Sequence, residues 1–159
     1  MRIQLICTAP PKTVYGNRVT ATRWSKLFRA LGNSVESSQH YGGTICDLLI
    51  AMHGYRCADA VLQFHRRHPD KHSILVLTGT DIYQDIRKSS KVRDAMKAAN
   101  RIVTFEPLAA EEVPEEFRGK VRMIYQAADR TADAPKQDED NRSGPRLFRG
   151  RRGRNQLTG

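Results

Sequence analysis

The hydrophobic positions of the chain fall into short runs that are bounded by polar residues, glycine or proline. Runs rich in Ile, Val and Leu are typical of strands that are buried on both faces. One further segment, residues 34–41 (SVESSQHY), is poorer in apolar residues, which favours a place at or near the edge of a sheet. The pattern therefore predicts six strands, at residues 3–7, 34–41, 48–52, 74–77, 102–105 and 121–125.

Helical patterns separate these runs. Residues 56–68 and 90–99 carry apolar residues at helical spacing, and a shorter helical turn is expected at residues 108–112. Because strands and helices alternate, we expect an α/β protein with a Rossmann-like open parallel sheet of about six strands and helices on both faces. The first helix ends near Gly32, and its inward face is predicted from a spacing of three or four residues: Thr20, Trp24, Leu27, Phe28 and Leu31.

The character of the chain changes near residue 128. Residues 1–128 carry the periodic apolar pattern, whereas residues 129–159 are polar and contain glycine, proline and charged residues, so we expect a disordered tail there. The formal net charge of +10 favours anionic partners, such as phosphates, nucleic acid or an acidic membrane surface. An arginine-rich stretch at residues 146–154 leaves open an alternative function as a small basic nucleic-acid-binding protein, with weak and salt-sensitive binding through the tail.

The three cysteines, Cys7, Cys46 and Cys57, have no CxxC spacing, and we expect them to be reduced. The N-terminal apolar run is shorter than the core of a signal peptide, and no apolar stretch is long enough to span a membrane. These features predict a soluble, cytoplasmic protein.

Ligands of open α/β sheets bind beyond the carboxyl ends of the strands, where the strand order reverses. With the common order 3-2-1-4-5-6, strands one and four are neighbours, and the polar loops that follow them face each other. In the first loop Asn17 is expected to cap the helix. The amides of Arg18, Val19 and Thr20 would then be free to bind an anion, and Arg18 could add a bidentate contact.

The second loop, LTGTD at residues 77–81, supplies the opposite wall. It offers the Thr78 and Thr80 hydroxyls, the Gly79 backbone and the Asp81 carboxylate. His53, at the end of strand three, could reach a ligand or could serve the structure alone. A purely structural role for both loops also stays open, in which Asn17 only caps a helix and Thr80 and Asp81 only close a turn.

Two other kinds of site are disfavoured by the sequence. A dinucleotide site needs GxGxxG after the first strand, whereas CTAPPKTVYGNR has the single glycine Gly16. His65 and His68 are three residues apart on a helix but lack a further ligand at suitable spacing, so no metal is expected.

Several segments together resemble the N-terminal half of the GT-B glycosyltransferase-like proteins that include the selenosugar synthase of selenoneine biosynthesis, a glycosyltransferase family 4-like group. The resemblance runs in order over residues 1 to 128. It is carried by APP at 9–11, GNRVTATRW at 16–24, CDLLIAMH at 46–53, HP at 68–69, LTGTDIYQD at 77–85 and IYQAA at 124–128.

The resemblance implies a hexosyltransferase that moves a sugar from a UDP-sugar, with UDP-N-acetylglucosamine as the expected donor, to selenophosphate. The UDP-sugar is a co-substrate held mainly by a second domain, and no other cofactor is implied. The resemblance implies two catalytic candidates. Arg18 would neutralise the acceptor's charge, and Asp81 would orient its neighbours or contact the sugar. The residues expected to bind the acceptor anion are Gly16, Asn17, Thr20, His53, Thr78, Gly79, Thr80 and Tyr83.

The family continues after IYQAA into a second Rossmann-like domain, whereas this chain continues with the polar segment 129–159. We therefore expect the donor-binding domain to be absent and the chain to be truncated or frame-shifted and inactive alone, unless a donor domain is encoded separately.

Overall fold

The computed structural model of the protein describes residues 1–127. Their strands are β1 (Arg2–Ile6), β2 (Ser34–Ser38), β3 (Leu48–Met52), β4 (His72–Val76), β5 (Arg101–Thr104) and β6 (Val121–Met123). Their helices are α1 (Gly16–Ala30), α2 (Ala58–Arg67), the π-helical turn η1 (Asp81–Asp85), α3 (Ile86–Lys88), α4 (Ser90–Ala98), α5 (Pro107–Glu111) and α6 (Glu115–Arg118). The predicted tail at 129–159 and its arginine-rich stretch lie outside the described residues.

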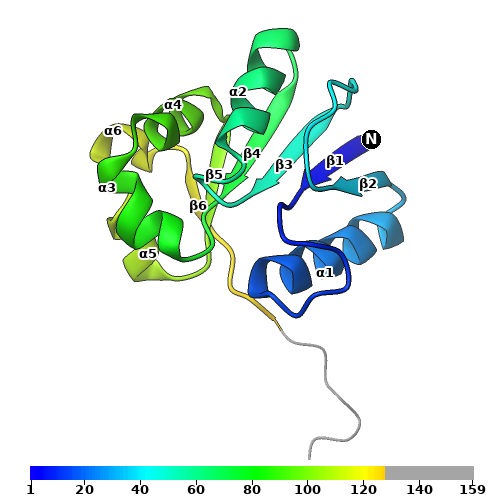
Figure 1. The fold of residues 1–159 in the computed structure, drawn as a ribbon, viewed down its shortest axis with the longest axis horizontal. Helices are drawn as coiled ribbons and strands as arrows, with labels where there is room; N and C mark the ends of the chain where they lie inside the picture. The colour runs from blue at the N-terminus through cyan, green and yellow to red at the C-terminus, as the bar shows by residue number, and fades with distance from the viewer. Residues whose placement is uncertain (128–159) are drawn as a thin grey trace, which may run out of the picture. The chain divides into compact units, whose positions relative to one another are not determined.

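All six strands belong to one parallel sheet, in the order β2-β1-β3-β4-β5-β6. Each strand is paired in register with its neighbours, as Ile3 is with Leu48 and Ile50 with Ile74. Helix α1 lies on one side of the sheet, and α2 and α4 lie on the other (Figure 1). The predicted Rossmann-like α/β fold is therefore confirmed, with each of the six predicted strands present.

The predicted strand order 3-2-1-4-5-6 is wrong, because β3 rather than β2 lies inside the sheet. The reason is burial: four of the five β3 residues are buried, whereas β2 buries only Val35 fully. A strand that is apolar on both faces must be covered on both edges as well, while the polar β2 tolerates the edge position. The reversal of strand order therefore lies between β1 and β3.

Two apolar clusters, one on each face, hold the sheet to its helices. On one face Leu49, Leu75 and Ile102 pack with Val61 and Phe64 of α2 and with residues of α4. On the other face, Leu5, Ile50, Met52 and Val76 pack with Ala21 of α1. Trp24, Phe28 and Phe105 pack against this cluster. The loops at the carboxyl ends of the strands join these cores at their bases, through residues such as Ala9 and Leu77.

The predicted inward face of α1 is correct only in part. Thr20 is buried, and Trp24 packs edge-on against Phe28 and Phe105. Leu27 and Leu31, by contrast, keep 55% and 76% of their surface exposed. The helix contacts the sheet through a narrower stripe than the spacing indicated, because small residues such as Ala21 and Ser25 bring it close to the strands.

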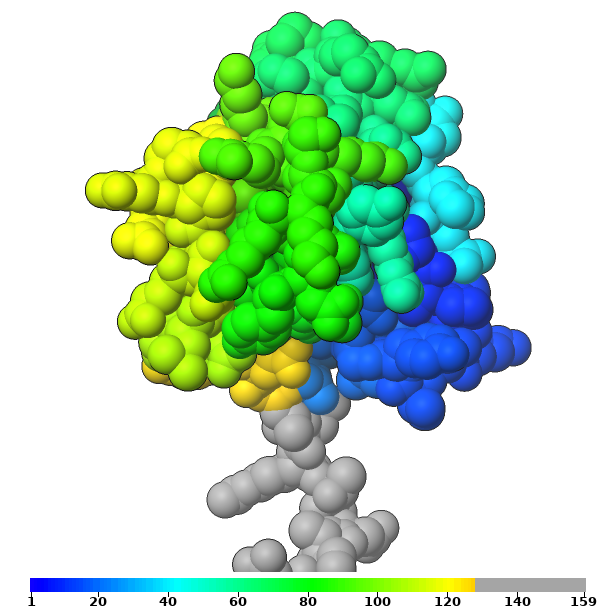
Figure 2. Space-filling model, turned by 60° about the vertical axis from the view of Figure 1, so that its left-hand side comes forward, coloured from blue at the N-terminus to red at the C-terminus, as the bar shows by residue number. Residues whose placement is uncertain are grey.

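The segment after β6 returns across the sheet towards α1 (Figure 1). The Gln126 side-chain amide donates to the Thr20 hydroxyl at 3.3 Å, and the Arg23 guanidinium donates to the carbonyl of Ala127. On another face, η1, α3 and α4 lie between the α5–α6 segment and α1 (Figure 2). Residues 1–127 thus form one compact unit.

Cys7, Cys46 and Cys57 are buried and unpaired. Burial raises the pKa of the Cys57 thiol to about 12, so it is protonated and unreactive at neutral pH. Within residues 1–127 no helix is both long enough and apolar enough to cross a bilayer.

Candidate anion-binding site

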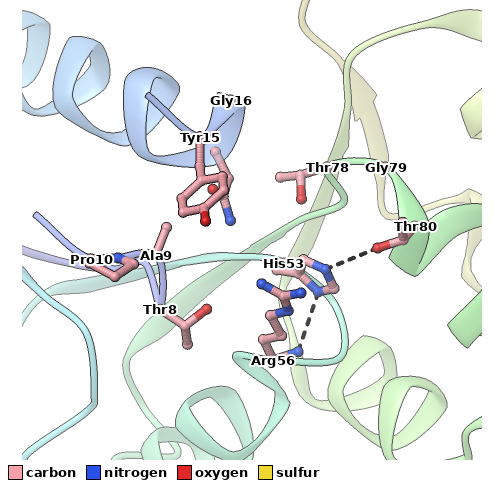
Figure 3. A pocket seen from close by; sticks show the side chains of 11 residues that line it. Thr8, Ala9, Pro10, Tyr15, Gly16, His53, Arg56, Thr78, Gly79 and Thr80 are labelled. Carbon is pink, nitrogen blue, oxygen red and sulfur yellow. Dashed lines mark hydrogen bonds between the residues drawn. The ribbon is translucent and has the colours of Figure 1, made fainter. Parts of the chain in front are cut away.

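The loops that follow β1, β3 and β4 surround a pocket of about 660 Å³ at the carboxyl edge of the sheet (Figure 3). The pocket lies where the strand order reverses, which is the usual ligand position in open α/β sheets. Its wall is formed by Thr8, Ala9, Pro10, Tyr15, Gly16, Asn17, His53, Arg56, Thr78, Gly79 and Thr80. The two loops that the sequence predicted to face each other both line it, and the β3–α2 loop lies between them.

The first wall is the N-terminus of α1. Tyr15, in an extended conformation, occupies the cap position, and no side chain of the described residues caps the helix. The first helical bond runs from the Val19 amide to the Tyr15 carbonyl at 3.0 Å, so the Gly16, Asn17 and Arg18 amides precede it. Asn17 was predicted as the cap and is instead the second helical residue, because the helix begins at Gly16, two residues earlier than predicted. The amides that remain open still suit an anion.

Arg18 is turned away from the pocket. Its side chain is 8% exposed, and its guanidinium donates to the carbonyl of Cys7 at 2.7 Å and to that of Ala9 at 2.9 Å. A further guanidinium nitrogen lies 3.4 Å from the Ser37 hydroxyl. Since these bonds occupy the fork, the geometry gives no support to the predicted contact with an anion. Arg18 instead fixes the β1–α1 loop, whose carbonyls would otherwise be buried without donors.

The second wall is the loop after β3, which carries His53 and Arg56. His53 is 6% exposed, and its Nδ1 accepts the amides of Tyr55 and Arg56, each at 3.3 Å. Its Nε2 lies 3.4 Å from the Thr80 hydroxyl. Burial lowers the pKa of His53, against the opposing effect of the Asp81 carboxylate, so the ring is neutral at pH 7.

Arg56 lines the pocket but was not predicted from the sequence, and the same holds for Thr8, Ala9, Pro10 and Tyr15. The Arg56 side chain is exposed, and its guanidinium points into the pocket beside the His53 ring (Figure 3). Within residues 1–127 this guanidinium has no hydrogen bond or ion pair. Among the described residues that line the pocket, Arg56 is the one with a full charge at neutral pH. Its position three residues after His53, at the carboxyl end of a buried strand, was the available signal.

The third wall is the loop after β4, which is fixed by Asp81. This carboxylate is completely buried and accepts the amides of Gly54 at 2.6 Å, Gly79 at 2.7 Å and Thr78 at 3.0 Å. It therefore joins the loops after β3 and β4 and does not line the pocket. Of its two predicted roles, orienting its neighbours agrees with this geometry.

Two glycines allow this close approach. Gly79 has φ of +151°, which side chains other than hydrogen rarely permit. A Cβ at Gly54 would lie 2.9 Å from the Leu77 Cδ2 and 3.4 Å from the Asp81 side chain. The Asp81 carboxylate reaches the Gly54 amide because no side chain intervenes.

The remaining predicted residues divide into two groups. Gly16, Asn17, His53, Thr78, Gly79 and Thr80 line the pocket, whereas Arg18, Thr20, Asp81 and Tyr83 do not. The Thr20 hydroxyl donates to the Gly16 carbonyl at 3.0 Å and so supports the first turn of α1. The Tyr83 hydroxyl donates to Glu106 at 2.6 Å, and this bond raises the pKa of Tyr83.

The arrangement favours an anion over a cation or a metal. Among residues 1–127 no carboxylate lines the pocket, and the buried Thr8 hydroxyl on its wall has no hydrogen-bond partner there. Within residues 1–127 no group of three or more His, Cys, Asp or Glu side chains could hold a metal ion. Amides, hydroxyls and one guanidinium are groups that donate hydrogen bonds to oxyanions.

In comparisons with known proteins, no protein-family model matches this chain and no curated protein matches it.

Proposed function

We propose that the Rossmann-like domain binds a small oxyanion as the acceptor-side domain of a GT-B-type glycosyltransferase. The observation that carries the proposal is the Arg56 guanidinium, which has no hydrogen bond or ion pair within residues 1–127. It points into a pocket that no carboxylate of these residues lines and that contains the open N-terminus of α1. An arginine with no protein partner at such a position is available to a ligand, and its planar fork suits a tetrahedral oxyanion.

The size of the pocket supports more than an anion alone. A volume of about 660 Å³ exceeds what a tetrahedral oxyanion fills and falls within the range of sites for small molecules. The remaining space would take part of a second substrate. In the proposed reaction this is the sugar of a UDP-sugar, whose nucleotide would be held mainly by a second domain.

The glycosyl-transfer part of the proposal rests on the resemblance carried by GNRVTATRW and LTGTDIYQD. The selenium of selenophosphate would attack the anomeric carbon of the sugar. A carbon–selenium bond forms as the bond from that carbon to UDP breaks, and UDP leaves with the electron pair. Selenium is already anionic, so no general base is required, which agrees with a pocket that no carboxylate of residues 1–127 lines. The contribution of the residues is then positioning.

Residues in and around the pocket have distinct roles in this scheme. Arg56 and the amides of Gly16 and Asn17 would bind the acceptor oxygens, and Thr78 and Thr80 would add hydrogen bonds. Asp81 and Arg18 act indirectly, because they hold the loops that carry these groups.

The test is a transfer assay with labelled UDP-sugar and selenophosphate. We expect the chain alone to bind selenophosphate without forming a carbon–selenium bond, and a fusion to the donor domain of a complete homologue to form the glycosyl selenophosphate and release UDP. Replacing Arg56 by Ala in the fusion should lower turnover, whereas the exposed Arg66 of α2, replaced in the same way, should not. A fusion that binds UDP-sugar but makes the same product with Arg56→Ala as with Arg56 would contradict the assignment.

A further inference from the structure

His53 has a backbone conformation that is rare outside glycine. Its φ is +129°, and the residue lies directly after β3 on the wall of the pocket. The conformation is held from both sides, because the His53 amide donates to the Val76 carbonyl at 2.9 Å and its carbonyl accepts the Cys57 amide at 3.1 Å. Strain of this kind persists only where the surrounding structure imposes it, and it is concentrated at functional sites.

The hydrogen bonds of the ring define its tautomer. Nδ1 accepts two amides, those of Tyr55 and Arg56, and so carries no proton. A neutral ring with a bare Nδ1 has its proton on Nε2, which faces the Thr80 hydroxyl at 3.4 Å. The Thr80 oxygen then accepts from the ring, and its own hydrogen is free to point into the pocket.

The charged groups around the ring are Asp81 and Asp85 of η1 and the guanidinium of Arg56. The Asp81 Oδ2 lies 3.8 Å from Nδ1, too far for a hydrogen bond, and it already accepts the Gly54 and Thr78 amides. Both carboxylates favour a charged ring, whereas burial and Arg56 oppose it, and burial is the largest of these effects on the pKa of His53.

We propose that His53 is a positioning residue of the anion site: its neutral ring, protonated at Nε2, holds the turn that aims Arg56 into the pocket and orients the Thr80 hydroxyl as a donor. The inference rests on the proposed anion-binding function and adds a proton-dependent control to it. His53 does not itself donate to the anion in this scheme, because its one N–H is directed to Thr80.

Protonation of the ring would dismantle this arrangement. A hydrogen on Nδ1 would face the two amides that Nδ1 now accepts, so the Tyr55–Arg56 turn would lose both bonds. The nearest acceptor for the new hydrogen is Asp81. Arg56 would then lose its fixed direction. Simple attraction predicts that an added positive charge tightens anion binding, whereas the positioning role predicts that it weakens binding.

The experiment measures sulfate binding to the full chain by calorimetry, between about pH 8 and about pH 5, where histidine titrates and sulfate keeps its charge. The variants are His53→Asn, which keeps an acceptor near the Nδ1 position but does not titrate, and His53→Ala. The control is His65→Asn, at an exposed position on α2. Unfolding by denaturant is measured for each variant at each pH.

For the wild type we expect the affinity for sulfate to fall about fivefold or more as the pH is lowered, the loss expected from one hydrogen bond of about 1 kcal/mol. His65→Asn should follow the wild type. His53→Asn should bind with little dependence on pH, and His53→Ala should bind more weakly throughout. Affinity that is constant or rises towards low pH in the wild type, or a His53→Asn profile like that of the wild type, would overturn the positioning role.

Stability provides a readout that needs no ligand. Because the pKa of His53 is lowered in the folded state, the unfolded chain binds the proton more readily below about pH 6.5. The wild type should therefore lose free energy of unfolding as the pH falls below that value, and His53→Asn should lose less. Absence of sulfate binding at every pH would refute the anion site and with it the positioning role. If sulfate binds but the free energy of unfolding depends on pH in the same way in the wild type and in His53→Asn, the neutral ring is refuted and the anion site is not.

Discussion

Three buried polar residues around the pocket act on the backbone of the loops. Arg18 donates to the carbonyls of Cys7 and Ala9, and Asp81 accepts three amides from the loops after β3 and β4. His53 accepts two more amides. Each satisfies backbone groups at a place where the chain has left its strand and has no ladder partner. Several of the polar residues that were predicted to contact a ligand therefore hold the loops of the pocket in place.

Asp81→Asn tests this role at a single residue. An asparagine keeps the size of the side chain, but its amide group would face amides that now donate to a carboxylate oxygen. We expect a loss of about 2–3 kcal/mol in the free energy of unfolding, the value of a hydrogen bond to a charged group. Denaturant unfolding measures it, with Asp94→Asn on the exposed side of α4 as the control. Equal stability of the two variants would show that the buried carboxylate is not needed to join the loops.

At the scale of the elements, one side chain holds the β1–α1 loop. Arg18 lies in the first turn of α1 and reaches back to the carbonyls at the end of β1, so it connects the helix to the strand on either side of the loop. The open amides of Gly16 and Asn17 are aimed by the same helix. The position of the proposed anion site is therefore coupled to the packing of α1.

Arg18→Lys should separate positioning from direct contact, because it keeps the charge and loses the fork. We expect the free energy of unfolding to fall by about 1–2 kcal/mol with a moderate loss of sulfate affinity, since one ammonium cannot serve all of these acceptors. Arg66→Lys on α2 is the matched control. A variant that loses sulfate affinity while its stability equals that of the control would instead indicate that Arg18 binds the anion directly.

The elements themselves could be read from the sequence, but not their full arrangement. Runs such as LLIAM at 48–52 indicate strands because both faces are apolar, and the polar β2 indicated an edge. The apolar run of β3 favours the interior of the sheet, but its neighbours depend on which strands pair, and the local pattern does not specify them. The π-helical turn η1 was not predicted, because it forms around the buried Asp81 carboxylate and the positive φ of Gly79.

The candidate site could also be predicted only in part: its loops were predicted, but not the roles of their arginines. Polar loops at the carboxyl ends of strands were visible as GNR and LTGTD, and both line the pocket. The roles of the two arginines were not visible, because they depend on the direction of each side chain. Arg18 was predicted to bind the anion, but its guanidinium donates to backbone carbonyls. Arg56 lines the pocket, although in its loop only His53 was predicted as a site residue.

At the scale of the whole molecule, the excess of positive charge complicates any binding measurement. A chain with a formal net charge of +10 attracts anions over its whole surface, and this attraction weakens with salt. A specific site must therefore be distinguished from the general field. The structure offers this distinction because Arg56 points into the pocket while Arg66, on α2, is exposed and does not line it.

The most direct test of the account is the affinity of the full chain for sulfate with Arg56→Ala and with Arg66→Ala, at one pH near neutrality and at physiological salt. Both variants lose one positive charge, so the general field changes equally. We predict that Arg56→Ala weakens binding by about 1.5–3 kcal/mol, roughly ten- to hundredfold in Kd, and that Arg66→Ala leaves it nearly unchanged. Equal effects of the two substitutions would contradict an anion site at the carboxyl ends of β1, β3 and β4.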